Sequence, residues 1–128
     1  MPASILIADD HDDNRELLRL LLLNAGYSVR ECRDGNECLA SALNEPPDLI
    51  VMDLSMPVLD GWAVLRQLKA DERTQKIPCM AVTAHADLGR NEALETGFTA
   101  YVSKPFSSDH LLKTVATVLA NRTTTGHI

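Results

Sequence analysis

The chain has 128 residues and a net charge of −6, with 45% hydrophobic and 23% charged residues. This length suits one domain with its own core and leaves no room for a second. The acidic balance excludes the basic surface that nucleic-acid binding requires, no apolar run approaches the roughly 20 residues of a membrane span, and no basic leader precedes the first apolar run. We expect a single cytoplasmic domain over residues 1–128, with a core from about residue 4 to 120 and a flexible tail at 121–128.

Five short apolar segments alternate with five longer segments of helical periodicity. The expected strands are residues 5–8, 28–32, 49–52, 78–83 and 100–103. The expected helices are residues 14–25, 35–43, 61–70, 87–96 and 108 to about 120. Strands this continuously apolar are buried on both faces, which favours a parallel sheet covered by helices. Strict alternation predicts an α/β fold of the flavodoxin-like, doubly wound type, with strand order 2-1-3-4-5 and five helices.

The first predicted helix has two distinct faces. Asp13 and Glu16 have the spacing of a capping box, and Gly26 marks the end of the helix. A helical wheel turns one stripe toward the sheet, namely Leu18, Leu21, Leu22 and Ala25, with Leu17 on its flank. Leu20 and Leu23 point away and form a small apolar patch, which is either scattered surface leucine or a partner or dimer surface.

The candidate functional side chains follow the ends of the predicted strands. In an open α/β sheet, ligands bind beyond the carboxyl ends of the strands, where strand order reverses, here between strands 1 and 3. Asp9 and Asp10 follow strand 1, and Asp53 follows strand 3. Three neighbouring carboxylates repel one another unless a cation lies between them, and a site with only oxygen ligands favours Mg²⁺. Asp12 and Asp13 are interpreted as capping residues instead of ligands.

Two further polar groups follow the remaining strands. Thr83 ends strand 4, and Lys104 follows strand 5. A carboxylate nucleophile, a metal site, a hydroxyl donor and a fixed cation together suit phosphoryl transfer, in which catalysis consists mostly of positioning and charge neutralisation. Cys32, Cys38 and Cys79 are too scattered for a CxxC pair or a zinc site, so we expect three reduced thiols, two of them in the core.

Four segments of the sequence resemble the hallmark blocks of response-regulator receiver domains. They are ILIADD, DLIVMDLSMPVLDG, AVTA and YVSKPF, in the order and at the spacing of that family, and the resemblance covers roughly residues 4–120. The resemblance implies that Asp53 is the phosphoacceptor. It also implies a magnesium site formed by Asp10, Asp53 and the backbone carbonyl of Ser55, with Asp9 acting through water.

The resemblance assigns the remaining groups as well. Lys104 resembles the active-site cation, and the Lys104–Pro105 bond is expected to be cis, a state that costs little before proline. Thr83 resembles the switch hydroxyl. Tyr101 resembles the aromatic that moves between an outward and an inward rotamer, although an ordinary edge-strand aromatic would look the same. Ser55 and His85 occupy two positions that tune phosphoryl lifetime in this family, and His85 is equally consistent with an exposed loop residue without effect.

The function implied is that of a phosphoacceptor in a two-component or phosphorelay system. A sensor histidine kinase or a histidine phosphotransfer protein would donate the phosphoryl group, and a downstream protein target would bind the switched form. We expect self-catalysed phosphorylation and slow self-dephosphorylation, with no turnover on an external substrate, and therefore not an enzyme in the usual sense. Met1 and the short tail favour a stand-alone protein over a fragment of a hybrid kinase.

Three other classes are less consistent with the sequence. A phosphatase of the haloacid dehalogenase type would carry its nucleophile on the first strand, with an acid two residues later, whereas Ser55 lies two residues after Asp53. A nucleotide-binding module would show G-x-G-x-x-G or a Walker A loop, and neither is present. A degenerate receiver would lack Asp53, Asp10 or Lys104.

Overall fold

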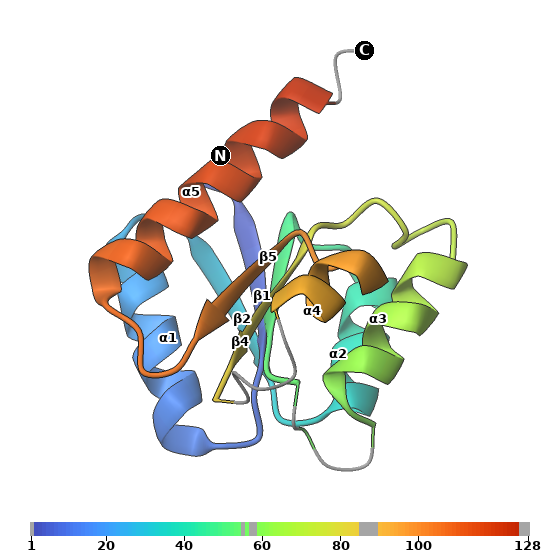
Figure 1. Cartoon of the computed structure of the whole chain (residues 1–128), viewed down its shortest axis with the longest axis horizontal. Coiled ribbons are helices and arrows are strands. Elements are labelled where there is room, and N and C mark those ends of the chain that lie inside the picture. Colours follow the sequence, from blue (N-terminus) through green and yellow to red (C-terminus); the bar gives the residue numbers. More distant parts are fainter. Residues whose placement is uncertain (1, 55, 57–58, 85–89, 126–128) are drawn as a thin grey trace.

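The computed structural model describes residues 2–54, 56, 59–84 and 90–125, with residues 90, 91 and 122–125 described through their helices alone. Its centre is a five-stranded parallel sheet in the order β2-β1-β3-β4-β5, as predicted (Figure 1). The strands are β1 (Ser4–Ala8), β2 (Ser28–Cys32), β3 (Leu49–Met52), β4 (Cys79–Thr83) and β5 (Ala100–Ser103). The predicted fold class is therefore confirmed.

In the described residues, four helices connect the strands and a fifth follows β5. They are α1 (Asp12–Asn24), α2 (Gly35–Asn44), α3 (Gly61–Ala70), α4 (Arg90–Thr96) and α5 (Ser108–Thr125). Residues 87–89, where we expected the fourth helix to begin, lie outside the described part of the chain. No helix within the described residues is long and apolar enough to cross a membrane.

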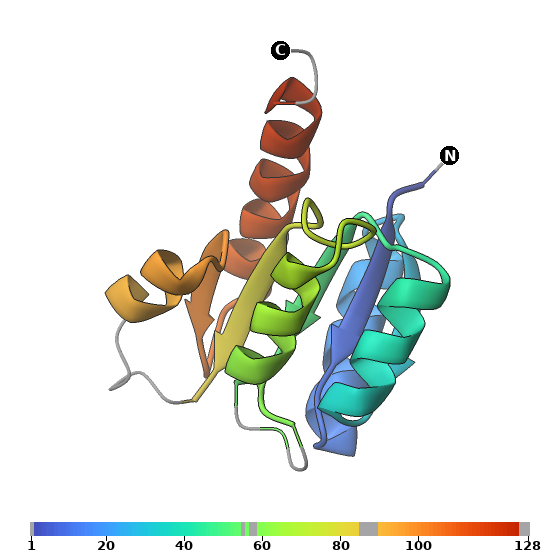
Figure 2. The same cartoon turned by 90° about the vertical axis from the view of Figure 1, so that its right-hand side faces the viewer.

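The helices form two layers around the sheet. α1 and α5 cover one face, where Leu18, Leu22 and Leu111 pack on strand residues such as Ile7 and Val51. α2, α3 and α4 cover the other face, which Figure 2 shows from the front. Both faces of β3 and β4 are buried, as the apolar runs in the sequence require.

Side chains cap α2, α3 and α5. The carboxylate of Asp34 accepts a hydrogen bond from the Glu37 amide at 2.9 Å, and that of Asp60 accepts one from the Ala63 amide at 2.9 Å. The Ser107 hydroxyl, directly before α5, accepts from the His110 amide at 3.1 Å. Gly26 follows α1 with a φ of 99°, a conformation that costs glycine little.

The predicted start of α1 was wrong. The helix begins at Asp12 and not at Asn14; its N-cap is His11, and no side chain makes a cap hydrogen bond, so the Asp13–Glu16 capping box does not form. The cause lies at the end of β1, where the His11 amide donates to the Asp9 carboxylate at 2.8 Å and the helix starts directly behind it.

Two expectations at helix ends were also wrong. Ala25 is exposed and does not belong to the buried stripe, because α1 ends at Asn24 and the chain turns there. α5 continues to Thr125, five residues beyond the expected end at Ala120. Asn121 and the threonines are weak helix formers, but neither glycine nor proline interrupts the segment before Gly126.

Candidate functional site

The carboxyl ends of β1 and β3 bring three acidic side chains together. β1 and β3 pair in parallel with Ala8 opposite Met52, and the Asp53 amide donates to the Ala8 carbonyl at 2.9 Å. Asp9 and Asp53, the next residue of each strand, are buried, with 1% and 5% of their surfaces exposed. The side chain of Asp10 is 27% exposed. The three predicted carboxylates therefore form one acidic pocket, defined here as Asp9, Asp10 and Asp53.

Lys104 places its ammonium group against this pocket. Its Nζ lies 3.0 Å from Oδ2 of Asp9 and 3.2 Å from Oδ2 of Asp53. The end of β5 sets its position, because the Lys104 amide donates to the Thr83 carbonyl at 2.9 Å. The Lys104–Pro105 peptide bond is cis, as expected. One ammonium group facing three carboxylates leaves the pocket with an excess of negative charge.

The acidic pocket has the donor set of a divalent cation site. Oδ1 of Asp10 is buried and accepts no hydrogen bond from the described residues, although Nδ1 of His11 lies 3.2 Å away. One ligand atom each from Asp9, Asp10, His11 and Asp53 lies within 4.8 Å of the others. A buried carboxylate oxygen without a hydrogen bond is costly unless it has another partner. The residues present therefore fit a hard divalent ion.

Arg15 holds the backbone of the acidic pocket, a role that the sequence analysis did not predict. Its guanidinium is almost fully buried, donates to the Asp9 carbonyl at 2.8 Å, and pairs with Asp12 and with Glu31. Burial lowers the pKa of Arg15, but the hydrogen bond to Asp12 and the neighbouring carboxylates outweigh it, so the pKa is raised. The same hydrogen bond lowers the pKa of Asp12. Arg15 thus fixes the backbone that presents Asp9 and Asp10.

Gly61 lies directly against the backbone of Asp53. A Cβ at this position would be 2.8 Å from the Asp53 carbonyl oxygen and 2.9 Å from Cα of Leu54. Both contacts are shorter than real Cβ atoms show, and both involve backbone, which gives way less easily than a side chain. Only glycine allows α3 to begin this close to Asp53.

The two predicted switch residues lie on β4 and β5. Thr83 is fully buried and ends β4, with Ser103 opposite it on β5. Tyr101 is 9% exposed and belongs to the core cluster between the sheet and α2, α3 and α4. Their switching roles stay predictions. The two residues predicted to tune phosphoryl lifetime, Ser55 and His85, lie outside the described residues. Ser55 is also the residue whose backbone carbonyl was predicted to bind the metal.

The outer face of α1 carries the predicted leucine patch. Leu20 and Leu23 are 46% and 42% exposed, whereas Leu18 and Leu22 are buried. Leu17 is equally exposed and extends the ridge by one turn. The side chains chosen as the patch thus point outward as predicted, and their role in binding a partner remains a prediction.

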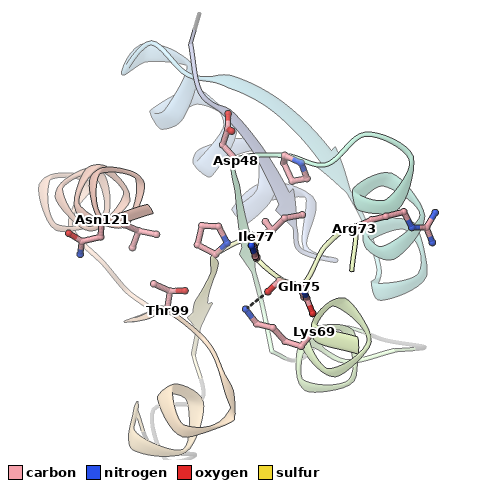
Figure 3. A pocket seen from close by; sticks show the side chains of 11 residues that line it. Asp48, Lys69, Arg73, Gln75, Ile77, Thr99 and Asn121 are labelled. Atoms are coloured by element: carbon pink, nitrogen blue, oxygen red, sulfur yellow. Dashed lines mark hydrogen bonds between the residues drawn. The ribbon is translucent and has the colours of Figure 1, made fainter. Parts of the chain in front are cut away.

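A cavity of about 640 Å³ lies at the opposite end of the sheet (Figure 3). It is lined by residues that precede β3, β4 and β5, such as Asp48, Pro78 and Thr99, and by Lys69 of α3. The Lys69 ammonium donates to the Gln75 carbonyl at 3.2 Å. Neither the acidic pocket nor any other predicted site residue lines this cavity.

Comparisons with known proteins agree with the geometry. A family model described as the response regulator receiver domain matches residues 5–116. The polar-differentiation response regulator DivK of Brucella anthropi is 38% identical over 122 residues, which are 94% of this chain and 99% of DivK.

Solved structures show the same similarity. The chemotaxis response regulator CheY4 of Vibrio cholerae matches with a TM-score of 0.85 and 30% identity, over 92% of this chain and 99% of that one. The receiver domain of the sensor histidine kinase PA1611 of Pseudomonas aeruginosa matches with a TM-score of 0.87 and 31% identity, over 94% and 99%; it was solved with a magnesium ion coordinated in its active-site cleft. With the fold, the acidic pocket and a family match over nearly the whole sequence, this chain belongs to the response regulator receiver domain family.

Proposed function

We propose that Asp53 accepts a phosphoryl group from a phosphohistidine and that the modified domain then binds a downstream protein. The observation that carries the proposal is the position of the Asp53 carboxylate, which is buried beside Asp9 and Asp10 and lies 3.2 Å from the Lys104 ammonium. A nucleophilic carboxylate next to a fixed cation suits phosphoryl transfer, in which the protein positions groups and neutralises charge.

The transfer step is a displacement at phosphorus. An oxygen of the Asp53 carboxylate bonds to phosphorus as the bond between phosphorus and the donor imidazole nitrogen breaks. The imidazole keeps that electron pair and leaves as a neutral ring when its other nitrogen already carries a proton. Lys104 then faces the phosphoryl oxygens and offsets their charge, and the Thr83 hydroxyl turns toward them.

Magnesium is the cofactor we assign to the acidic pocket. Asp10 and Asp53 would hold it directly, Asp9 through water, and the family resemblance adds the backbone carbonyl of Ser55. When bound, the ion supplies the positive charge that lets a carboxylate pocket accept a phosphoryl group. The Pseudomonas relative with magnesium in its cleft supports this assignment.

Release of the signal reverses the modification without a separate phosphatase. Water attacks phosphorus, the bond to Asp53 breaks, and inorganic phosphate leaves. The domain thus catalyses its own phosphorylation and slow dephosphorylation and turns over no external substrate. Its donor is a sensor histidine kinase or a histidine phosphotransfer protein in the cytoplasm, and the acyl phosphate shifts an existing equilibrium between inactive and active conformations.

The test is labelling with a small phosphodonor. The protein with Mg²⁺ and acetyl phosphate or phosphoramidate should gain one phosphoryl group by intact mass, and hydroxylamine should remove it, as expected for an acyl phosphate. Asp53→Asn, a nearly isosteric change, should abolish labelling and keep the fold. Asp13→Asn, which changes an exposed carboxylate of α1, is the matched control and should label normally.

Two results would contradict the proposal. One is labelling of Asp53→Asn at the wild-type rate. The other is steady hydrolysis of p-nitrophenyl phosphate by the wild-type protein, which would indicate a phosphatase instead of a receiver.

A further inference from the structure

His11 stands at the edge of the acidic pocket and faces its carboxylates. Its Nδ1 lies 3.2 Å from Oδ1 of Asp10 and 3.5 Å from Oδ1 of Asp9. The backbone holds this residue in place, since its amide donates to the Asp9 carboxylate at 2.8 Å and its carbonyl accepts from the Arg15 amide at 3.0 Å. The imidazole is 63% exposed, so an ion or water can reach it from solvent.

The distance between Nδ1 and the Asp10 oxygen suits two ligands of one ion. Ligand atoms about 2.1 Å from a common metal are about 3.0 Å apart at neighbouring octahedral positions and about 3.4 Å apart at tetrahedral ones. The observed 3.2 Å falls between these values. The Asp10 oxygen is also the buried atom that accepts no hydrogen bond from the described residues.

Lys104 and the His11 amide contact several of the other carboxylate oxygens in the pocket. Asp9 uses one oxygen for the Lys104 ammonium and the other for the His11 amide. One oxygen of Asp53 accepts from the Lys104 ammonium at 3.2 Å, and Asp53 also contributes a ligand atom within 4.8 Å of those of Asp10 and His11. Nitrogen from His11 and oxygen from Asp10 and Asp53 therefore form a set of one imidazole and two carboxylates.

Such a set discriminates between metals. Magnesium takes oxygen ligands and keeps its waters, so an imidazole adds little to its binding. Zinc, cobalt and nickel bind imidazole nitrogen well, and their affinity rises when a nitrogen ligand joins carboxylates.

We propose that His11, Asp10 and Asp53 form a binding site for a first-row transition-metal ion of the zinc or cobalt type, which occupies the acidic pocket more tightly than magnesium and competes with it. The proposal rests on the proposed function, because both ions share Asp10 and Asp53. His11 distinguishes the two ions, because it binds the transition metal and does not bind magnesium. A protonated His11 that forms ion pairs with the same carboxylates would occupy the same position, and the experiment distinguishes ion pairing from metal binding.

The experiment measures Co²⁺ and Mg²⁺ affinity by calorimetry in three proteins. His11→Ala should weaken Co²⁺ binding by about tenfold or more and change Mg²⁺ binding by less than about twofold. His110→Ala is the matched control, because His110 is also an exposed histidine near the start of a helix, and it should change neither affinity. The cysteines do not compete for the ion, since all three are buried.

A second readout identifies the ligand directly. Proton NMR of the Co²⁺ complex should show a strongly shifted imidazole N–H resonance that His110→Ala keeps and His11→Ala loses. Co²⁺ affinity that survives His11→Ala, or a shifted resonance that persists in it, would overturn the inference. If the wild type still binds Mg²⁺ and labels on Asp53, the proposed function stands without it. If neither ion binds and labelling fails, both proposals are wrong.

Discussion

Gly61 couples the start of α3 to the residue that we propose as phosphoacceptor. In Gly61→Ala, the new methyl group would meet the Asp53 carbonyl at 2.8 Å, so the backbone of Asp53 must move. We expect a loss of about 1–3 kcal/mol in the free energy of unfolding, typical of overpacking, and slower labelling by acetyl phosphate. Urea unfolding and the labelling rate measure the two effects.

Gly26→Ala is the control for this change. Gly26 has a φ of 99°, but no heavy atom lies within 4 Å of the place a Cβ would take, so alanine there strains the backbone without touching the pocket. It should cost about 1 kcal/mol of stability and leave the labelling rate unchanged. Equal labelling rates in both variants would show that Gly61 serves stability alone.

The thiols give a prediction about pH. Burial raises the pKa of Cys79 to about 12, and the hydrogen bond to Cys32, together with burial, raises the pKa of Cys38 well above its ordinary value. Both thiols stay protonated when folded, so they stabilise the native state fully below their ordinary pKa of about 9 and lose this contribution at higher pH, in the case of Cys79 as the pH rises toward 12. Iodoacetamide at pH 8 should therefore leave Cys38 and Cys79 unmodified in the folded protein and alkylate both in urea. Rapid alkylation of Cys38 or Cys79 in the folded protein would contradict these pKa directions.

Residue patterns predicted the acidic pocket because its members follow strands whose order the alternation of elements already specifies. Arg15 could not be found in this way. Its neighbours suggest an ordinary charged position on a helix surface, and it is buried only because the Asp9 carbonyl, Asp12 and Glu31 satisfy its guanidinium. Those contacts join different elements, so they depend on tertiary structure. The tight contact of Gly61 with Asp53 was missed for the same reason.

At the scale of elements, the outer face of α1 offers a test of partner binding. Leu20 and Leu23 lie on it beside Leu17, while the buried leucines face the sheet. Replacing Leu20 and Leu23 with Gln should leave folding and acetyl-phosphate labelling unchanged. It should weaken phosphotransfer from the cognate donor, or disperse a self-associating form, by about 1–3 kcal/mol if both side chains are buried on binding.

A change on another helix provides the comparison. Leu94 of α4 is also exposed, and Leu94→Gln should not affect transfer if α1 is the docking surface. Transfer rates and oligomeric state that are identical in all three proteins would leave the α1 leucines as ordinary surface residues.

Helix ends were the least predictable elements. The interior of α1 follows its apolar periodicity, but its first residue depends on a hydrogen bond between the His11 amide and Asp9, which belongs to the end of β1. α5 was predicted to end at about Ala120, and the helix continues because no glycine or proline in Asn121–Thr125 terminates it. Periodicity thus locates a helix, whereas its boundaries depend on neighbouring elements or on a stop residue.

For the molecule as a whole, the pocket predicts a stability that depends on magnesium. Mutual repulsion among Asp9, Asp10 and Asp53 opposes folding, and an ion bound only by the native state adds stability of about 1.4 kcal/mol at ten times its dissociation constant. The melting temperature should therefore rise with Mg²⁺, as measured by calorimetry. Asp10→Ala should remove this dependence and, by relieving repulsion, raise the melting temperature without magnesium.

An ionic-strength control separates binding from screening. NaCl of equal ionic strength should give a smaller rise, since it screens the carboxylates without occupying the pocket. A melting temperature that does not respond even to high Mg²⁺ would exclude a metal site in the pocket.

The common direction of the five strands also separates the start of β1 and the end of α5 from the residues that carry the chemistry. The amino end of β1 and the carboxyl end of α5 lie at one end of the molecule (Figures 1 and 2). The acidic pocket lies at the other end of the strands, because its residues follow the carboxyl ends of β1 and β3. β1 has 5 residues, so its amino end and its carboxyl end are about 17 Å apart. Attachment to a solid support at either position would therefore leave the pocket open to solution. A dye attached there would report on tumbling or crowding and would be insensitive to charge changes at Asp53.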